Sequence, residues 1–312
     1  MILLKEIVKA YYDLDIIEII PYSVPTGYNE LYKVKISTNE YFALKVHLDR
    51  FVHDNQIEAQ DVFKRLLRSS NIPAVPYIPT IEFKHSIMVN HTIITLEPWC
   101  ERIMVVKNEF PFLKKLLQMM AKMHLVSEKS ETINVSNGTR WRIFGENKTN
   151  SLRDYDEIDL NFKVIIDKFP EVYGGYTRVL KALIPLWHIL PSGIVHGDLS
   201  LNNCSFDDMN NINGIFDFNL IGMDKFVNEL VQTTLMNVYF NRSEAISYER
   251  GLIEIAELIN TYEAIRKLSD VENQAMQLIF RLSFISNFGL SLPLNIINSI
   301  LEGDYDGVVR TK

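Results

Sequence analysis

The sequence predicts an α+β protein of two lobes, with an antiparallel-sheet lobe first and a mainly helical lobe second. Three observations predict this division. Short runs with period-two alternation are concentrated in residues 1–98, helical spacing of apolar residues prevails over most of 99–312, and Pro98 ends the last early run. The 312 residues, 47% of them hydrophobic, are enough to give each lobe a core. We therefore expect two domains, 1–98 and 99–312.

The expected elements of the first lobe alternate between strands and helices. Asn39 and Glu40 separate two alternating runs, which is typical of an antiparallel hairpin. Ile57, Phe63 and Leu67 follow helical spacing. In chain order we expect an amphipathic helix over 1–14, strands over 16–23, 26–38 and 41–47, a helix over 54–68, a proline-broken turn over 71–83 and a strand over 91–98.

The second lobe is expected to be helical except around two polar segments. Helices are predicted over 110–129 and 176–190, where Pro185 is placed to kink or break the second helix. Ser269 and Glu272 form the pattern of a capping box ahead of an apolar run. Short strands and loops are predicted over 193–207 and 212–222, and helix from about 225 to 302.

Composition and charge exclude several classes of protein, among them nucleic-acid binders and membrane-spanning proteins. The formal net charge is −7 with no basic cluster, so we expect no nucleic-acid partner. The two cysteines, Cys100 and Cys204, make no disulfide framework. The N-terminal run carries Lys5, Glu6 and Lys9 and is not a signal peptide, and no uncharged apolar run reaches the roughly 18 residues of a membrane span. We expect a cytoplasmic protein without a membrane partner, either a monomer or a homodimer.

The polar segment from 194 to 206 carries the first chemical signal. His196, Asp198 and Asn203 form the pattern H-x-D-x-x-x-x-N, and Asp217 follows in a similar apolar context. Phosphoryl transfer from a nucleotide needs an acid that orients the attacking hydroxyl and hard oxygen ligands for Mg²⁺. Asp198 can serve as the orienting acid, while Asn203 and Asp217 can hold the metal. The alternative is a surface turn followed by an unrelated carboxylate at a hairpin end.

A cation for the donor phosphates is available in the first lobe. Lys45 ends a predicted strand, and Glu58, on the next predicted helix, could pair with it. Each of these residues alone is more simply a solvated surface charge. Together with Asp198, Asn203 and Asp217, however, they follow the order that a two-lobed kinase requires: strand lysine, helix glutamate, catalytic loop and metal aspartate.

At these residues the sequence resembles the phosphotransferase superfamily of aminoglycoside phosphotransferases, choline kinases, fructosamine kinases and bacterial homoserine kinases. The specific motifs are His-Gly-Asp-Leu-Ser-Leu-Asn-Asn at 196–203 and Phe-Asp-Phe at 216–218. The resemblance covers roughly residues 20–290. Weaker parts of it are GYNELYKVK at 27–35, YFALKV at 41–46, NIPAVP at 71–76, MMAKMHL at 119–125 and LINTYEAIRKLSDVENQAM at 258–276.

This resemblance implies a protein-kinase-like fold that binds ATP, or GTP as the alternative, with Mg²⁺ between a nucleotide-binding lobe (1–98) and a catalytic, acceptor-binding lobe (99–312). It implies that Asp198 is the catalytic acid/base residue and that Asn203 and Asp217 are Mg²⁺ ligands. It also implies that Lys45 contacts the α- and β-phosphates, with Glu58 as its partner.

The resemblance assigns supporting roles to five further residues. Gly27 belongs to the hairpin that covers the nucleotide, and the linker around Glu97 and Trp99 faces the adenine. His196 is expected to hold the backbone of the catalytic loop. Relatives tend to anchor that loop with an Asp in the helix after the metal aspartate, where this chain offers the longer Glu229.

A second departure from the family lies in the catalytic loop. Relatives often have His-Pro-Gly where this chain has Ser200-Leu201-Asn202, so Asn202 must adopt the turn conformation of that glycine, which Asn tolerates well. Neither departure removes a group that the chemistry needs.

The expected function is therefore transfer of the γ-phosphate to a hydroxyl of a small molecule: an aminoglycoside-like antibiotic, an amino alcohol, a sugar or a homoserine-like metabolite. Arg140, Trp141 and Arg142 are candidates for acceptor contacts, although an ordinary surface loop explains them equally well. The alternative function is a non-catalytic nucleotide-binding or scaffold protein of the same fold, for example one associated with a spore coat. A protein kinase is disfavoured, because no Ala-Pro-Glu segment follows Asp217.

Overall fold

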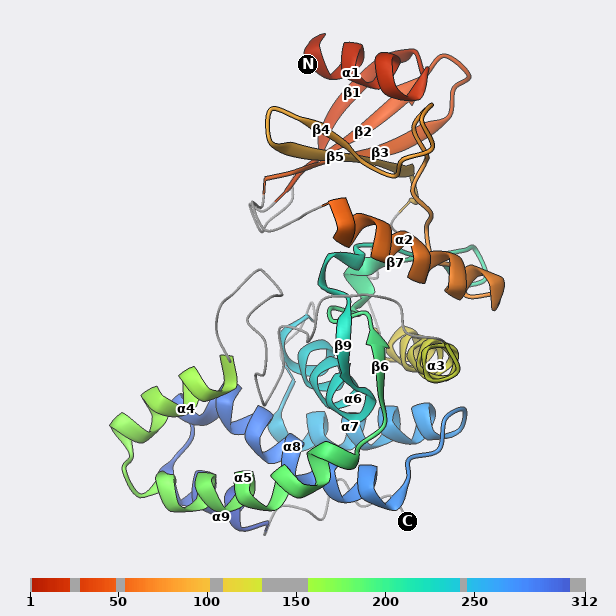
Figure 1. Cartoon of the computed structure of the whole chain (residues 1–312). Helices are drawn as coiled ribbons and strands as arrows, with labels where there is room; N and C mark the ends of the chain where they lie inside the picture. Colours follow the sequence, from red (N-terminus) through yellow and green to blue (C-terminus); the bar gives the residue numbers. More distant parts are fainter. Residues whose placement is uncertain are drawn as a thin grey trace.

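The structure is a computed structural model that describes residues 2–22, 29–48, 54–101, 109–130, 157–241 and 246–303. Figure 1 shows a sheet with one covering helix at one end of the molecule and a group of helices at the other. The five strands of the sheet lie within residues 16–98 and most of the helices follow, so the predicted α+β class with a sheet lobe and a helical lobe is confirmed.

The N-terminal lobe is built on a five-stranded antiparallel sheet with the order β1-β2-β3-β5-β4. The predicted hairpin is present, with Lys35 opposite Tyr41 beside its turn. Val34, Leu44 and Leu96 on the sheet and Val8 on the covering helix form a core of their own. The elements are α1 (Ile2–Tyr12), β1 (Ile16–Tyr22), β2 (Asn29–Ile36), β3 (Tyr41–His47), β4 (Ile87–Val89) and β5 (Thr92–Pro98).

The helix α2 (Asp54–Ser69) lies between the sheet and the helical lobe (Figure 1). Its Phe63 and Leu67 are fully buried in the core of the helical lobe, and Ile57 joins a small separate cluster with Tyr77 and Ile93. The hydrophobic cores therefore place much of α2 with the second lobe, although it precedes residue 98. The domain boundary at 98/99 stays a prediction.

The helical lobe contains long helices around two small strand pairs. The strand pairs are β6 (Ser192–Val195) with β9 (Gly222–Lys225) and β7 (Cys204–Phe206) with β8 (Ile212–Ile215). The helices are α3 (Phe110–Glu128), α4 (Glu157–Lys168), α5 (Val172–Ile189), α6 (Phe226–Leu235), α7 (Tyr248–Glu263), α8 (Asp270–Phe288) and α9 (Leu294–Glu302). The sequence analysis did not predict α4.

Two local expectations can be compared directly with these helices. Pro185 lies inside α5 and does not end it. The capping box is present: the Ser269 hydroxyl accepts a hydrogen bond from the Glu272 amide at 3.3 Å, and the Glu272 carboxylate accepts one from the Ser269 amide at 3.0 Å. Within the described part of the chain, no helix is long and apolar enough to cross a membrane.

The burial of α2 leads to a prediction about stability. Replacing Phe63 with Ala should lower the free energy of unfolding by about 3–5 kcal/mol, because the variant leaves a cavity in the core of the helical lobe. Val62, the neighbouring residue on α2, is 38% exposed and provides the matched control, since Val62→Ala should have a much smaller effect. Equilibrium denaturation of both variants measures the difference. Equal losses would contradict the placement of α2.

Candidate active site

The polar loop, residues 196–203, connects β6 to β7 and depends on a glycine. Gly197 has a φ of +79°, and a Cβ atom added to it would lie 2.2 Å from the carbonyl oxygen of Leu220. Other residues rarely adopt this conformation, and none can approach the Leu220 backbone so closely. The loop therefore turns at Gly197 directly against the segment that follows Asp217.

His196 is buried under this loop and bonds backbone on both sides. Its Nε2 lies 3.2 Å from the carbonyl oxygen of Phe216, and its Nδ1 accepts a hydrogen bond from the Asp198 amide at 3.3 Å. A carbonyl only accepts, so Nε2 carries the hydrogen. Burial lowers the pKa of His196, which favours this neutral form. The imidazole therefore holds the loop, and no free nitrogen faces a substrate.

Asn203 and Asp198 are joined within the loop. The Asn203 side-chain amide donates to the Asp198 carbonyl at 2.7 Å and to the Asp198 carboxylate at 3.1 Å. A short 3-10 turn over Leu201–Asn203 brings Asn203 back toward Asp198. Asn202 has a negative φ in this turn, so the loop requires no glycine at that position.

Asp217 meets Lys45 although 172 positions separate them in the chain. The Lys45 Nζ lies 2.6 Å from Oδ1 of Asp217, and Asp217 itself has a φ of +63°. Left-handed backbone in a non-glycine residue is uncommon and occurs often at functional sites. Burial acts to raise the pKa of the Asp217 carboxyl, but the Lys45 ammonium outweighs it and holds that pKa below its usual range.

The predicted ion pair between Lys45 and Glu58 does not form in this structure. Glu58 is half-exposed on α2, and its carboxylate lies 3.0 Å from Nδ1 of His85. Lys45 instead contacts Asp217. The reason is the orientation of α2, which turns Glu58 toward the loop before β4 and presents another charged residue, Lys64, to the interior.

Lys64 and Glu97 form a buried ion pair that the sequence analysis missed. Their charged atoms are 2.5 Å apart, and the Lys64 ammonium also lies 3.4 Å from the centre of the Tyr77 ring. Burial lowers the pKa of Lys64, and Glu97 partly opposes this shift. The signal was available, because Lys64 occupies a helical position between Ile57 and Leu67 on the apolar face of α2.

Strand register places Glu97 on the same side of the sheet as Lys45. Glu97 is opposite Ala43 and Thr95 is opposite Lys45, and alternate residues of a strand share a face. Lys64 also lies 5.3 Å from the centre of the Phe218 ring, directly after Asp217. The two ion pairs, Lys45–Asp217 and Lys64–Glu97, therefore lie between the sheet and the residues around Asp217.

The linker after β5 extends the sheet by one hydrogen bond. The Trp99 amide donates to the Tyr41 carbonyl at 3.0 Å. Trp99 and Tyr41 thus form a hydrogen-bonded pair of the antiparallel ladder. Such pairs alternate along the strand, so Pro98, the residue before Trp99, directs its carbonyl away from β3. The Trp99 ring packs edge-on against Tyr22. Gly27, Arg140, Trp141 and Arg142 lie outside the described residues.

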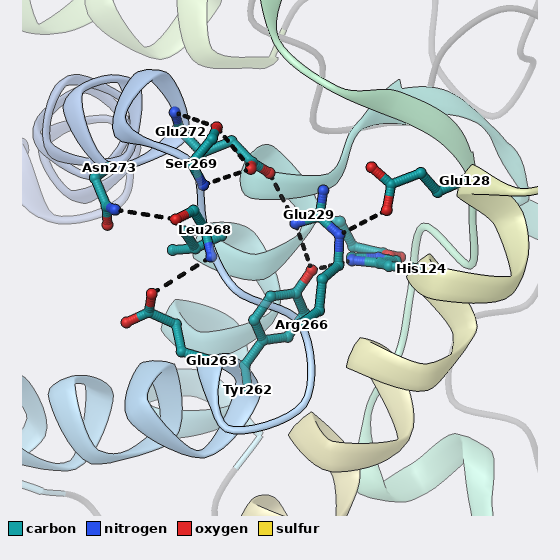
Figure 2. Close-up of polar contacts among 10 residues, drawn as sticks. All are labelled: His124, Glu128, Glu229, Tyr262, Glu263, Arg266, Leu268, Ser269, Glu272 and Asn273. Carbon is teal, nitrogen blue, oxygen red and sulfur yellow. Dashed lines mark hydrogen bonds and ion pairs between the residues drawn. The ribbon is translucent and has the colours of Figure 1, made fainter.

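Glu229 on α6 uses both carboxylate oxygens in the interior. Oε1 accepts a hydrogen bond from the Gly197 amide at 2.6 Å, and Oε2 lies 2.6 Å from Nε2 of His124 on α3. Figure 2 shows His124 and Glu229 in contact, with Tyr262 and Arg266 beside them. The longer carboxylate therefore reaches the polar loop. No motif spacing in the sequence indicated this role for His124.

Comparisons with known proteins show which family the chain is similar to. A family model described as the phosphotransferase enzyme family matches residues 111–268, just over half of the chain. A homoserine kinase of Rhodospirillum rubrum is 33% identical over 103 residues, a match that spans 33% of this chain and 30% of that protein.

Solved structures resemble the whole chain at low sequence identity. An amicoumacin kinase in complex with AMP-PNP and Ca²⁺ has a TM-score of 0.68 and 13% identity, and the match covers 100% of this chain and 95% of that one. A microcompartment-associated aminopropanol kinase has a TM-score of 0.64 and 15% identity, with coverage of 97% and 95%. These likenesses show the protein-kinase-like fold.

The chain belongs to the phosphotransferase enzyme family. It has the two-lobed, protein-kinase-like fold that the sequence predicted.

The requirement for glycine at position 197 can be tested by comparing its substitution with that of a glycine that the structure does not require. Gly197→Ala should strongly destabilise the protein or distort the loop, because the added Cβ would collide with the Leu220 backbone. Gly174 in α5 has open space around its Cα, so Gly174→Ala should raise the free energy of unfolding by about 0.5–1 kcal/mol. Thermal unfolding of both variants measures the two changes in stability, which should have opposite signs. A Gly197→Ala variant as stable as the wild type would contradict the loop geometry.

The buried ion pair leads to a prediction by double-mutant cycle. Lys64→Met leaves the Glu97 charge buried without its partner and should cost about 3–5 kcal/mol of stability. Adding Glu97→Met should recover much of that loss, because two well-packed apolar side chains can replace a buried pair. Lys33→Met, which breaks the more exposed pair with Glu101, serves as control and should cost at most about 1 kcal/mol. Urea denaturation of these variants and of Glu97→Met alone gives the four values that are needed, and additive losses from Lys64→Met and Glu97→Met would contradict the coupling.

Proposed function

We propose that this protein transfers the γ-phosphate of ATP, or of GTP, to a hydroxyl of a small molecule with the help of Mg²⁺. The observation that carries the proposal is the contact of Lys45 with Asp217. This contact brings the lysine of the sheet lobe to the carboxylate that follows the polar loop, in which Asn203 holds Asp198. Phosphoryl transfer requires chiefly positioning and charge stabilisation, which these groups supply.

Asp198 is proposed as the residue that touches the acceptor. Its carboxylate would accept the hydrogen of the attacking hydroxyl and direct that oxygen toward the phosphorus. The Asn203 side-chain amide holds one oxygen of this carboxylate at 3.1 Å. His196 holds the loop backbone and Glu229 the Gly197 amide, so both are positioning residues in this proposal.

The residues present fit a hard divalent cation. Because the Asn203 amide nitrogen bonds Asp198, its amide oxygen is the atom for a metal, and the Asp217 carboxyl is held in its charged form. Within the described ranges, no group of three or more His, Cys, Asp or Glu side chains could hold a metal. A magnesium site completed by phosphate and water oxygens suits such a donor set. Bound there, Mg²⁺ would neutralise the charge of the β- and γ-phosphates.

The nucleotide would bind between the sheet and the polar loop. Lys45 is proposed to contact the α- and β-phosphates, and Gly27 to belong to the hairpin above them. Since the Trp99 amide is used by Tyr41, the adenine would meet other linker groups, first the Pro98 carbonyl that faces away from β3. Glu97 contributes through its pair with Lys64, at the sheet side of this space.

We propose an acceptor that carries an amine as well as a hydroxyl. The relatives named for their substrates act on homoserine, amicoumacin and aminopropanol. The net charge of −7 favours a cationic acceptor over an anionic one. The helical lobe would bind this acceptor, and the cytoplasm, with its ATP and Mg²⁺, is the proposed location of the reaction.

An acceptor panel tests the proposed function. The protein is incubated with ATP and Mg²⁺ and with aminoglycosides, amino alcohols, amino acids or sugars, and ADP release and phosphorylated product are measured. Product with an amine-bearing acceptor supports the proposal. A thermal shift with ATP and Mg²⁺ but no product across the panel would favour a non-catalytic nucleotide-binding protein. No shift at all would favour a scaffold.

The role of Asp198 is tested by a single substitution. Asp198→Ala should lower kcat by about 10²–10⁴-fold, because the acceptor hydroxyl loses its orienting base, and should leave nucleotide binding nearly unchanged. Asp208, in the exposed turn between β7 and β8, provides a nearby control, since Asp208→Ala should retain full activity. Steady-state kinetics with the acceptor found in the panel give both values. An Asp198→Ala variant with wild-type kcat would refute the assignment.

A further inference from the structure

A chain of buried polar contacts continues from Glu229 away from the polar loop. His124 Nδ1 lies 2.7 Å from the Tyr262 hydroxyl, and Arg266 donates to the same hydroxyl at 3.3 Å. All four side chains are buried, and Figure 2 shows them meeting between α3, α6 and the end of α7. We call His124, Glu229, Tyr262 and Arg266 the buried relay.

The direction of each hydrogen bond in the relay follows from the groups themselves. An arginine can only donate, so the Tyr262 oxygen is the acceptor of that bond. The phenolic hydrogen is then free to go to His124 Nδ1, which must be unprotonated to accept it. His124 therefore carries its hydrogen on Nε2 and donates it to the Glu229 carboxylate. That carboxylate also accepts from the Gly197 amide.

The opposite arrangement leaves a hydrogen without an acceptor in the relay. If His124 were protonated on Nδ1, the Tyr262 oxygen would accept from both His124 and Arg266. The phenolic hydrogen would then have no acceptor in the relay, which is costly in the interior. Arg266 thus determines the orientation of Tyr262, and Tyr262 determines the tautomer of His124.

Arg266 is itself held at the junction of α7 and α8. It donates to the Glu272 carboxylate at 2.8 Å and lies 3.5 Å from the carboxylate of Glu128. Glu272 is the same residue that closes the capping box with Ser269. The loop between the helices is also fastened, because the Leu268 amide donates to Glu263 at 3.4 Å (Figure 2). The start of α8 thus fixes the position of Arg266.

We propose that Tyr262 and Arg266 are positioning residues for the transfer reaction. They hold His124 in the Nε2–H tautomer so that Glu229 can place the Gly197 amide and, with it, Asp198. The catalytic consequence rests on the proposed function, whereas the tautomer does not. The proposal gives a role to the segment 258–276, whose tyrosine, arginine, serine and second glutamate all take part in these contacts.

Tyr262→Phe tests the relay because it removes only the phenolic oxygen. In the wild type, nitrogen NMR of labelled histidine should show His124 with Nδ1 unprotonated and Nε2 protonated. In the variant the Nδ1 resonance should shift as it loses its hydrogen bond, and hydrogen exchange of the Gly197 amide should become faster. With the acceptor found in the panel, kcat should fall about tenfold while KM for ATP changes less than about twofold.

Tyr239→Phe is the matched control. Tyr239 is a half-buried tyrosine of the helical lobe, and its hydroxyl donates to the Tyr248 carbonyl at 2.9 Å, outside the relay. It should lose comparable stability but leave the His124 resonances, Gly197 exchange and kcat at wild-type values. If both variants changed these three readouts alike, Tyr262 would be an ordinary packing residue.

Two further outcomes separate the relay from the proposed function. A wild-type His124 that is protonated on Nδ1 would overturn the relay regardless of activity. If the wild-type protein phosphorylated no acceptor, the proposed function would fail. The tautomer and the exchange of the Gly197 amide would still decide whether Tyr262 orients His124.

Discussion

The backbone of Gly197 is the constraint on which the site depends. Its amide is held by Glu229, and its Cα lies against the Leu220 backbone, so no side chain fits there. The polar loop is thereby fixed to α6 on one side and to the segment after Asp217 on the other. Asp198 and Asn203 follow within six residues, so the position of Gly197 also determines theirs. Helices α3 and α7 contribute to this position because His124 contacts Glu229 and Tyr262 contacts His124.

Two lysines carry the electrostatic connection between the sheet and the rest of the molecule. Lys45 reaches from β3 to Asp217, whereas Lys64 reaches from α2 to Glu97 on β5. A buried charge is tolerated only when it is paired, so the buried Lys64 requires Glu97, whereas the half-buried Lys45 gains from its contact with Asp217. The segment around Asp217 is in contact with both lysines, since Lys64 also lies over the Phe218 ring. The sheet and the helical lobe are therefore coupled by charge as well as by packing.

Much of the fold was predictable because its signals are local. The hairpin of β2 and β3, the helix α2 and the capping box at Ser269 each follow from residues close together in the chain. Asp198, Asn203 and Asp217 could be predicted as site residues for the same reason, because their motif spans a short segment of the chain. The pairing of Lys45 was not predictable, because it depends on the rotation of α2 about its own axis. The local pattern shows that α2 is amphipathic but does not show which charged residue of α2 faces the sheet.

The residues that sequence reasoning missed are connected through space and not along the chain. His124, Glu229 and Tyr262 come from three helices, and no spacing rule relates them. Lys64 was overlooked because a lysine on a helix is usually solvated, although its position on the apolar face of α2 was visible. A charged residue on the apolar face of a helix indicates a buried ion pair, because burying a charge without a partner is so costly.

The packing of α2 determines how the sheet can move relative to the helical lobe. Phe63 and Leu67 attach the helix to the larger core, while Ile57 and Lys64 touch the sheet through Ile93 and Glu97. A movement of the sheet relative to the helical lobe would then be a rotation of the sheet and α1 over a stationary α2. The pivot would lie at the contacts that Ile57 and Lys64 make with β5, and the distal strand β1 would travel farthest.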